Sequence, residues 1–578
     1  MTIPLQTHER QSARRSILAG LSGVTRLSPP AGLSKRVSPW GWAAILALTA
    51  LTLLGFWLRV QQLSAEGLAD DEVYKWLAAN RYLHGDFGGF DVEHPMLMKG
   101  LIALTALFAP ASWAPETITR FPNAVAGAAS IWVIALLGRR LFGRAAGLFA
   151  AALAAVSTTY VGYQRVAKED TLLGLFLMVM LWCIAEARAA AEEDRTRDQR
   201  RFELWGAISL GAMFASKYFL FFAPIPVVAY AWLRASGARW HVPTRRWLQL
   251  IGVAFVVFSA LNWTPFMPST WSYLRHHMAG EHVVTASMFF MGRIYDNVPF
   301  HLREGMPPSF YFILPLVKFT PALFLTAAAG IGLAVWRREP ADRIALTWLV
   351  LWYVVWLLCG GKYARYFVTI LPAFLLFAAH ASVEAVRFLM SSLSWRVGTL
   401  RPMRAAAGFA LSPALVLALA LPASLVGAET AISLRLAPHY RLYINALGGG
   451  DARVNWFFPH CDYFDAGFRE AIQYVAAHAE RGAEVSTEID LPAKLYAERA
   501  GRPDLVQTLV RRDTACKSNR PCYVVFQAGR LYRTNAEAVG HLAPRQPWHV
   551  ERIRGLEAVT VYRLEPGESP FPIESSAA

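Results

Sequence analysis

The stretch LMKGLIALTALFAP, residues 97–110, decides how the later part of the chain is arranged. Its only charged residue is Lys99, but it is shorter than the roughly 20 residues that a helix needs to cross a bilayer. If it crosses, every later loop changes sides. We interpret residues 97–110 as a segment that lies in the outer membrane interface or re-enters it without crossing, because only this choice makes the later loops consistent.

Those later loops are rich in arginine. They are GRRLFGR (138–144), RAAAEEDRTRDQRR (188–201), RASGARWHVPTRR (234–246), RREPADR (337–343) and RFLMSSLSWRVGTLRPMR (387–404). If residues 97–110 do not cross, all five fall on the side of the basic N-terminal tail, as the positive-inside rule requires. We therefore predict that Arg139, Arg195 and Arg245 are cytoplasmic, and that Asp71, Asp170, Lys362 and Cys516 face outside.

The composition predicts a polytopic α-helical membrane protein. The chain has 578 residues, of which 55% are hydrophobic and 17% charged, whereas soluble domains carry about 25% charged residues. The net charge of +16 fits cytoplasmic loops rich in Lys and Arg, so we expect no nucleic-acid partner. We expect about eleven spans of bilayer length. They are 40–59, 121–138, 145–163, 171–188, 203–216, 219–234, 247–265, 310–335, 344–360, 366–387 and 405–427.

The domain organisation follows from where the apolar runs begin and end. We expect a basic cytoplasmic tail (1–38), a transmembrane domain (39–428) whose first outer loop is 60–120, and an extracytoplasmic domain (429–578). The stretch 464–490 predicts an amphipathic helix followed by a strand, and PCYVVFQ (521–527) and AVTVYRLE (558–565) predict further strands. The last region is therefore expected to be a small α/β domain. Cys516 and Cys522 are able to pair there if it faces an oxidising compartment.

Acidic residues gather near the start of the expected first outer loop, well before residues 97–110. Asp70, Asp71 and Glu72 precede an amphipathic pattern, EVYKWLAANRYL (72–83). Val73, Trp76, Leu77, Asn80 and Leu83 share one face of the expected helix, which we expect to lie on the membrane surface. Asp70 is the natural N-cap, but three acids in a row exceed what capping requires. A carboxylate at the lipid–water boundary is well placed to take a proton from a hydroxyl group.

A second acidic motif, QRVAKEDT (164–171), stands before another span. Asp170 is either a helix cap or a functional acid, and Glu169 either pairs with Lys168 or Arg165 or lines a substrate site. Both acidic motifs are expected at the outer face, where they are able to meet. Two convergent carboxylates beside basic groups suit glycosyl transfer, since one can deprotonate the acceptor while the bases hold a phosphate.

Several basic residues stand at the outer ends of spans. The candidates for binding a phosphate are Lys99, Arg165, Lys217, Lys318, Lys362 and Arg365. The alternative for each is a side chain that extends from the membrane to the interface. In GGKYARYF (360–367), Lys362 and Arg365 are three apart and are expected on one helical face, a spacing that suits phosphate. A weaker metal motif, HHMAGEH (276–282), offers His276, His277, Glu281 and His282, but its spacing is not a recognised zinc pattern.

Taken in order, the motifs DDEVY, FDVEHPMLMKGLIAL, AKEDTLL and GGKYARYFVTILP resemble the GT-C fold glycosyltransferases that use polyprenyl-phosphate sugars. The similarity is to the group of protein O-mannosyltransferases and aminoarabinose transferases, and it covers most of residues 40–470. Two later stretches, 295–321 and 438–450, are also similar to bacterial members. The resemblance implies that residues 39–428 form a catalytic domain and that the enzyme inverts the anomeric centre.

The resemblance also assigns roles to residues. It implies that Asp71, with Glu72 beside it, takes the position of the catalytic base and that Asp170 is the second acid. It implies that His94, Pro95 and Lys99 fill the motif closing the first outer loop, although HPMLMK lacks the second Pro and the Gly of the family pattern. The donor phosphate is then expected at Lys99, Arg165, Lys217, Lys362 and Arg365, and the substrate loop at Asp70, Glu93, His94 and Glu169.

The expected function is an inverting transfer of sugar from a polyprenyl-phosphate carrier to a protein, lipid or glycan acceptor at the outer face. A divalent cation near Asp71 and Asp170 is a candidate cofactor, but the sequence does not require one. The alternative is a transporter or flippase for a polyprenyl-linked or anionic solute, with acids near the bilayer midplane and spans broken in matched halves. A scaffold that binds cell-wall partners is a third interpretation. Acids clustered at one face favour the enzyme.

Overall fold

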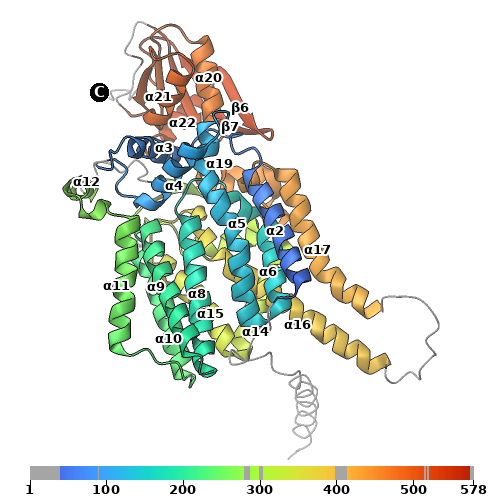
Figure 1. Ribbon diagram of the computed structural model, residues 1–578. Coiled ribbons are helices and arrows are strands. Elements are labelled where there is room, and N and C mark those ends of the chain that lie inside the picture. The colour runs from blue at the N-terminus through green and yellow to red at the C-terminus, as the bar shows by residue number, and fades with distance from the viewer. Residues whose placement is uncertain are drawn as a thin grey trace, which may run out of the picture.

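The computed structural model describes residues 40–572 apart from 89, 238, 279–286, 299–303, 398–412, 513–515 and 517–519. It has a bundle of long helices with an α/β region at one end (Figure 1). The bundle contains α2 (Trp42–Val60), α5 (Pro115–Phe142), α6 (Arg144–Val156), α8 (Asp170–Glu192), α9 (Thr196–Ser216), α10 (Pro224–Ala235), α11 (Thr244–Leu261), α14 (Pro321–Arg337), α15 (Pro340–Leu358), α16 (Leu371–Val397) and α17 (Pro413–Leu436).

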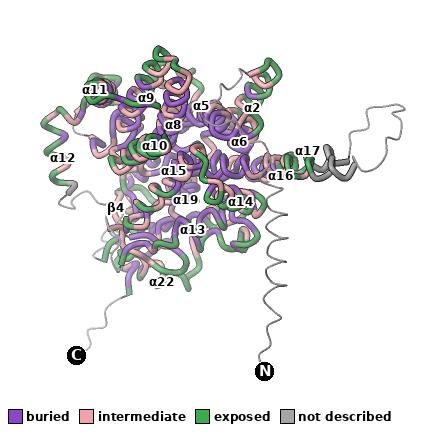
Figure 2. Tube along the Cα trace, turned by 90° about the horizontal axis from the view of Figure 1, so that it is seen from below, coloured by how far each residue is buried: buried purple, intermediate pink, exposed green. Residues whose placement is uncertain are grey.

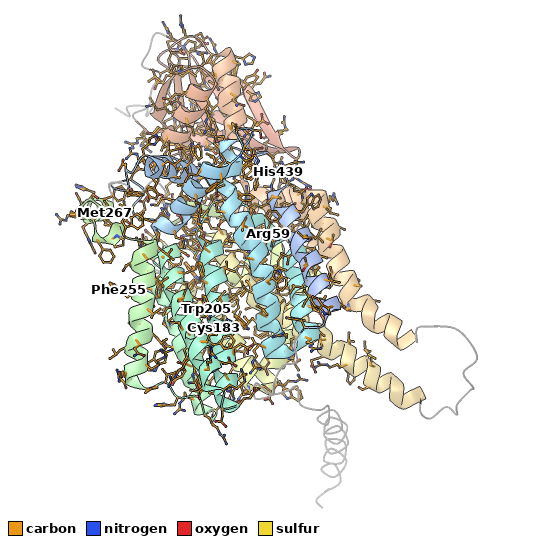
Figure 3. All side chains as sticks on the ribbon, in the orientation of Figure 1. Arg59, Cys183, Trp205, Phe255, Met267 and His439 are labelled. Carbon is orange, nitrogen blue, oxygen red and sulfur yellow. A yellow bond between two sulfur atoms is a disulfide. The ribbon has the colours of Figure 1, made fainter. Side chains whose placement is uncertain are left out.

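Six helices in the described part of the chain are long and apolar enough to cross a membrane: α2, α5, α8, α11, α15 and the first part of α16. Others, including α6 and α14, are apolar but shorter. The chain is therefore a multi-pass membrane protein, while the expected number of about eleven spans stays a prediction. Exposed apolar side chains such as Trp205 and Phe255 cover the flank of the bundle, as lipid-facing residues do (Figure 3).

The predicted spans differ from the observed helices in five places. Two of these are the spans 219–234 and 366–387, each divided into a 3-10 helix, η1 (Leu220–Phe222) or η3 (Ala364–Thr369), and an α-helix, α10 or α16. The span 145–163 is divided at Ser157 into α6 and α7 (Thr158–Tyr163). The span 310–335 is divided into α13 (Phe310–Lys318) and α14, because Pro321 opens a new helix whose N-cap, Thr320, accepts a hydrogen bond from the Leu323 N–H at 3.2 Å. The last span begins among residues outside the described part, and α17 continues to Leu436.

The segment 97–110 forms α4 (Met96–Phe108), and it lies beside α3 (Asp70–Leu83) at the end of the bundle that carries the α/β region (Figure 1). With 13 residues α4 is shorter than a typical crossing helix, and our interpretation that it does not cross stays a prediction. The buried face of α3 differs from the predicted one. It consists of Glu72, Val73, Lys75, Ala78, Ala79 and Tyr82. This face packs against α4 and α5, and the α/β region also contacts α3, so α3 is held by protein instead of resting on lipid.

The centre of the bundle is built from small residues on α5 and α6. A Cβ atom added to Gly147 would lie 2.5 Å from the carbonyl oxygen of Ala135, so the two helices approach too closely for any side chain there. Figure 2 shows that α5, α6 and α8 are largely buried, whereas α11 is largely exposed. Close packing of this kind is how membrane helices associate without a hydrophobic driving force between them.

The α/β region contains a five-stranded sheet in the order β4-β3-β5-β7-β6. Its strands are β3 (Glu484–Thr487), β4 (Val506–Leu509), β5 (Cys522–Gln527), β6 (His549–Ile553) and β7 (Leu556–Leu564). β4, β3 and β5 are parallel, and β7 and β6 are antiparallel to their neighbours. The helices are α20 (Phe468–His478), α21 (Asp490–Arg499) and α22 (Ala536–Leu542). The predicted helix and strands are therefore confirmed, and Cys516 is disulfide-bonded to Cys522.

Further short elements lie between the longer ones. They are α12 (Pro268–Met278), the hairpin β1 (Ser287–Phe290) and β2 (Arg293–Asp296), α18 (Val454–Phe457), α19 (Pro459–Tyr463) and the 3-10 helices η1 (Leu220–Phe222), η2 (Thr264–Phe266), η3 (Ala364–Thr369), η4 (Tyr440–Leu442), η5 (Ala446–Gly448) and η6 (Gly450–Arg453). Figure 3 labels His439, just before η4, close to the α/β region. Its Nδ1 lies 2.7 Å from Glu66 Oε1, which ties this junction to the loop before α3.

Candidate active site

The first turn of α3 carries Asp71 at the edge of a cavity. Asp70 is not the N-cap that the sequence predicts. That position belongs to Ala69, whose N–H donates to Glu72 Oε2 at 3.1 Å. Asp71 is free of capping and its side chain is one-third exposed, at 33%. Its Oδ2 lies 2.7 Å from Lys168 Nζ and 3.5 Å from Arg365 Nη2.

These two cations determine the charge of Asp71. Burial raises the pKa of a carboxyl group, but Lys168 and Arg365 outweigh it and hold the pKa of Asp71 well below its usual range. Burial in turn lowers the pKa of Lys168 to about 8, while Asp71 opposes this shift. The carboxylate is therefore ionised and ion-paired in the resting site.

Arg365 connects Asp71 to the second acidic motif. Its Nε lies 4.0 Å from Asp170 Oδ2, so the guanidinium stands between the two carboxylates. Lys217 Nζ donates to Asp170 Oδ1 at 2.6 Å and lies over the ring of Tyr366 at 4.2 Å. The structure therefore brings together Asp71, Asp170, Lys217 and Arg365, as the sequence analysis expected.

Glu169 extends the same cluster. It is buried and lies 3.0 Å from Lys75 and 3.9 Å from Lys168. The sequence analysis offered Lys168 as a partner of Glu169 but missed both lysines as members of the site. Lys75 stands one helical turn after Asp71, and Lys168 lies directly before the acidic pair, so spacing from the acids was the signal that could have found them.

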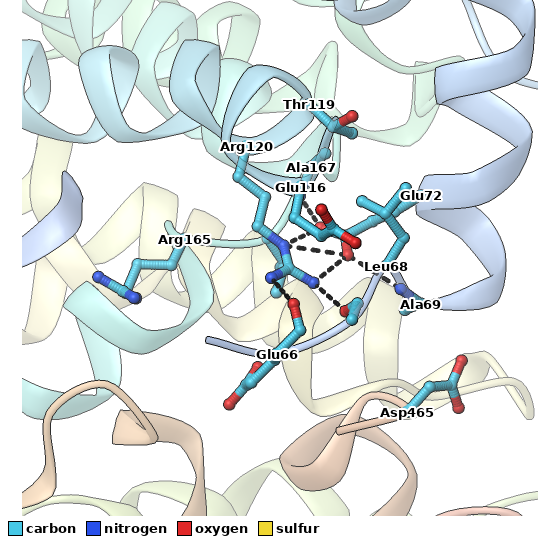
Figure 4. Close-up of polar contacts among 12 residues, drawn as sticks. Glu66, Leu68, Ala69, Glu72, Glu116, Thr119, Arg120, Arg165, Ala167 and Asp465 are labelled. Atoms are coloured by element: carbon cyan, nitrogen blue, oxygen red, sulfur yellow. Dashed lines mark hydrogen bonds and ion pairs between the residues drawn. The ribbon is translucent and has the colours of Figure 1, made fainter. Parts of the chain in front are cut away.

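The contacts of Glu72 give it a structural role. It is fully buried, where Arg120 Nη2 lies 2.6 Å from its Oε2 and the Ala167 N–H donates to its Oε1 at 2.7 Å (Figure 4). Arg120 also donates to the carbonyl oxygens of Leu63 and Glu66, both at 2.8 Å. This arrangement fastens the loop before α3 to α5, and it leaves Asp71 as the acid of the pair that faces the cavity.

The loop-closing motif forms a separate network of hydrogen bonds and ion pairs. Lys99 is buried, donates to the carbonyl oxygens of Asp91 and His94, and lies 3.6 Å from Asp91 Oδ2. His94 Nδ1 lies 2.9 Å from Asp91 Oδ1, and Glu93 lies next to it. Lys99 is thus held by the loop and not by the Asp71 cluster. Asp91 is a residue that the sequence analysis quoted but did not single out.

The remaining basic candidates have partners elsewhere. Arg165 donates to the carbonyl oxygens of Leu58 and Arg59, both at 3.0 Å. Lys318 Nζ lies 2.5 Å from Asp462 Oδ2. The expectation that Lys362 shares a helical face with Arg365 is wrong: Lys362 lies before η3, is buried, and donates to the carbonyl oxygen of Met306 at 2.8 Å.

A divalent cation does not fit between Asp71 and Asp170, because Arg365 occupies that place and Lys168 and Lys217 add two more positive charges. Asp91, Glu93 and His94 have ligand atoms within 4.8 Å of one another and could hold a metal, although Lys99 is adjacent. In the HHMAGEH motif, Glu281 and His282 lie outside the described residues, so that weaker metal motif stays a prediction.

The cavity beside Asp71 has a volume of about 70 Å³, is open to solvent, and lies between the bundle and the α/β region. It is lined from α3 and the residue before it by Ala69, Asp70 and Asp71, from the η3 segment by Tyr363 and Arg365, and from the C-terminal part by His460, Phe464, Asp465 and Arg530. The sequence analysis missed the last four, because they stand in no recognisable motif and only the folded chain brings them to α3.

Residues 93–263 match the family model described as dolichyl-phosphate-mannose-protein mannosyltransferase. No match was found among curated protein sequences. Among solved structures, the chain is similar to ArnT from Cupriavidus metallidurans in the apo state, with 14% identity, a TM-score of 0.51 and coverage of 90% of this chain and 98% of ArnT. It is also similar to the archaeal oligosaccharyltransferase AglB from Archaeoglobus fulgidus in complex with an inhibitory peptide and a dolichol-phosphate.

The AglB match has 12% identity and a TM-score of 0.51, and it covers 84% of this chain and 69% of AglB. Both proteins are glycosyltransferases of the GT-C fold. At these identities the likeness is one of architecture, and it extends over both the helical bundle and most of the remaining chain. The chain therefore has the GT-C fold of these membrane glycosyltransferases, and its residues 93–263 match the protein mannosyltransferase family.

Proposed function

We propose that this protein is an inverting glycosyltransferase that moves a sugar from a polyprenyl-phosphate carrier to an acceptor hydroxyl group. The observation that carries the proposal is that Arg365 lies between the carboxylates of Asp71 and Asp170, at the edge of an open cavity. A partly exposed carboxylate beside a concentrated set of cations provides a base and an anion site within a few ångströms of each other.

The phosphate of the donor is assigned to Lys168, Lys217 and Arg365. All three lie within 4.0 Å of Asp71 or Asp170, and charge-assisted hydrogen bonds from such groups are the strong contacts to phosphate oxygens. AglB, which this chain resembles in fold, has been observed in complex with dolichol-phosphate. A lipid of that chemical class is the donor carrier that we propose here.

Asp71 is the proposed base, and the donor phosphate controls its strength. With Lys168 and Arg365 as partners the pKa of Asp71 is too low for an effective base. A phosphate that binds the same two cations neutralises them, so the pKa of Asp71 rises toward its ordinary value. Donor binding thus prepares Asp71 to accept the proton of the attacking hydroxyl group.

The bond changes are those of one displacement. The acceptor oxygen attacks the anomeric carbon from the face opposite the phosphate, Asp71 takes the hydroxyl proton, and the bond to the phosphate oxygen breaks with inversion. The departing phosphate leaves as an anion stabilised by Arg365 and the two lysines, so no general acid is needed. Asp170 holds Lys217 and Arg365 in position.

The proposed topology places this site outside the cytoplasm, with the N-terminus inside and the α/β region outside. The loop charges support this orientation. The similarity of the chain to membrane glycosyltransferases favours the enzyme over a transporter or flippase.

The test compares cells with and without the protein by mass spectrometry of surface glycans, glycolipids and glycoproteins. We expect at least one species to lose a single sugar residue in the absence of the protein, and Asp71→Asn to reproduce this loss at normal protein level. Asp86→Asn is the control, because Asp86 is an exposed acid of the same loop. Unchanged glycans, with an anionic solute or lipid-linked sugar confined to one leaflet, would favour the transporter.

A further inference from the structure

The sheet of the α/β region has a point at which its connections diverge. From β3 the chain passes through α21 to β4 on one side, and from β5 it passes through α22 to β6 and β7 on the other side. β3 and β5 are parallel neighbours, so their carboxyl ends lie together. In open α/β sheets, ligands bind in the crevice outside the carboxyl ends of strands that diverge in this way.

Polar side chains fill the two loops at this point. Glu488 follows β3, and its Oε1 accepts a hydrogen bond from the Gln527 N–H at 3.1 Å at the end of β5. Three residues later, Arg530 donates from Nε and Nη2 to the two carboxylate oxygens of Asp465, at 2.6 and 2.7 Å. The Arg530–Asp465 pair is therefore fixed by both charge and bidentate geometry.

This crevice faces the cavity that contains Asp71. The Asp70 N–H donates to Asp465 Oδ2 at 2.9 Å, and Arg530 lies 3.6 Å from the Asp70 carboxylate. Asp465, Arg530 and His460 line the same cavity as Asp71. The divergence point of the sheet thus lies beside Asp70, the residue directly before the proposed base, Asp71.

The backbone at this wall is strained. Phe464 and Asp465 both have left-handed conformations, with φ of 47° and 61°. Non-glycine residues seldom adopt this region, and such strain persists where the surrounding structure holds a functional geometry. Here it directs the Phe464 ring and the Asp465 carboxylate into one cavity.

The groups of the wall suit a neutral ligand rich in hydroxyl groups. The charge of Arg530 is already compensated by its bidentate pair with Asp465, so a second anion placed directly against Arg530 would face the Asp465 carboxylate. Burial and the nearby Arg530 and Arg365 lower the pKa of His460 to about 3, so its imidazole is neutral and offers one donor and one acceptor. Tyr363 and Phe464 add ring faces against which a sugar ring can pack.

We propose that the α/β region supplies the sugar-binding wall of the active site, with Arg530, Asp465 and His460 hydrogen-bonding to the ring hydroxyls of a pyranose or furanose. This inference deepens the proposed function and rests on it. The sugar is either the one carried by the donor or one at the end of an acceptor glycan, since both have the same hydroxyl chemistry.

The experiment uses the full chain in lipid nanodiscs and two variants of the wall. Arg530→Lys keeps the charge but loses the bidentate geometry. His460→Ala removes a side chain whose one hydrogen-bond contact in the described structure, to Tyr532 Oη, is long at 3.5 Å, so folding should be preserved. Arg502→Lys is the matched control, because Arg502 makes a similar two-bond pair with Asp504, at 2.9 and 3.0 Å, elsewhere in the same region.

Affinity is measured for undecaprenyl phosphate, for the same lipid carrying each of a panel of pentoses and hexoses, and for the methyl glycosides of those sugars. We expect both wall variants to lose roughly tenfold or more of the affinity that a sugar adds, with unchanged affinity for the bare lipid phosphate. A loss in the lipid-linked arm identifies the donor sugar, and a loss confined to the methyl glycosides identifies an acceptor sugar.

The proposal is overturned if no sugar changes binding to the wild-type protein in either arm, or if both wall variants keep the full effect of the sugar. If undecaprenyl phosphate itself does not bind the wild-type protein, the proposed function fails, and the methyl glycoside arm alone then decides for or against the wall.

Discussion

Neighbouring acids of α3 should respond to substitution in opposite ways. Asp71→Asn keeps the shape of the side chain but removes its basicity, while Glu72→Gln removes the charge that is paired with Arg120. Asp71 is one-third exposed at the cavity, and Glu72 is fully buried. We therefore expect the first change to abolish transfer and the second to destabilise the fold.

The magnitudes follow from the environments. Loss of a general base lowers rates by roughly a hundred- to ten-thousandfold, which corresponds to about 3–5 kcal/mol in the activation free energy. Loss of one partner of a buried ion pair costs about 3–5 kcal/mol of stability, because the remaining charge has no compensation. In Glu72→Gln the remaining charge is that of Arg120, whose Nη2 lies 2.6 Å from Glu72 Oε2 in the wild type. Asp71→Asn should change stability less, because Asp71 is itself partly exposed and its two partners keep other carboxylates nearby, Glu169 beside Lys168 and Asp170 beside Arg365.

The assay measures three quantities on purified protein in nanodiscs: the thermal midpoint, the affinity for undecaprenyl phosphate and the transfer of sugar from the donor to acceptor. Asp71→Asn should bind undecaprenyl phosphate at least as tightly as the wild type, because the phosphate no longer competes with a carboxylate for Lys168 and Arg365. Asp86→Asn serves as the control for loss of an exposed acid. Near wild-type turnover of Asp71→Asn, or an unchanged thermal midpoint of Glu72→Gln, would refute the assignment of roles.

Three further predictions follow from the site and the topology. Lys168→Gln should weaken binding of undecaprenyl phosphate by roughly ten- to a hundredfold through loss of a charge-assisted contact, whereas Lys362→Gln, whose ammonium group is held by carbonyl oxygens, should bind normally; equal effects would move the phosphate site. Burial raises the pKa of Asp70 to about 7 from 3.8, against the opposing effect of Arg530, so the stability that its proton contributes is complete below pH 4 and is lost as the pH rises through 7. The thermal midpoint should therefore fall less between pH 5 and 8 in Asp70→Asn than in the wild type, and identical pH profiles would contradict this. A cysteine at position 139 should react with a membrane-impermeant thiol reagent only from the cytoplasmic side and one at position 552 only from outside; the reverse would invert the topology.

The arrangement of the fold could be predicted from the sequence where a physical rule applies over many residues. Length and loop charge gave an interpretation of residues 97–110 that stays a prediction; the structure shows that α4 is a short helix that packs against α3, α5 and α9. The breaks at Ser157 and Phe319 were missed because both runs stay hydrophobic on average, although Ser157 to Thr159 interrupt the first and Lys318, Thr320 and Pro321 interrupt the second, and average hydropathy does not register a change of helix direction. The buried face of α3 was misjudged because Glu72 and Lys75 are buried by ion pairs with distant residues.

The candidate site could be predicted in part, because its acids stand in compact motifs. The positions of Asp71, Asp170, Lys217 and Arg365 follow from motifs at span ends, yet the sequence does not show which cations share them. Lys362 and Arg365 are close in the chain, but the backbone before η3 separates their side chains. Arg530 lies far from Asp70 in the sequence, and only the docking of the α/β region brings it to 3.6 Å. Such contacts depend on tertiary packing, which no local pattern records.

The position of Arg365 between two carboxylates also has a consequence for the end of the catalytic cycle. After transfer, the spent lipid phosphate occupies the cations that Asp71 held at rest, and Asp71 carries the proton of the acceptor. As long as Asp71 keeps that proton it is uncharged, so it does not compete with the phosphate for Lys168 and Arg365. Release of the proton to water restores a carboxylate 2.7 Å from Lys168, which then expels the lipid. Discharge of the used carrier is therefore coupled to deprotonation, and inhibition by free polyprenyl phosphate should deepen as the solution becomes more acidic.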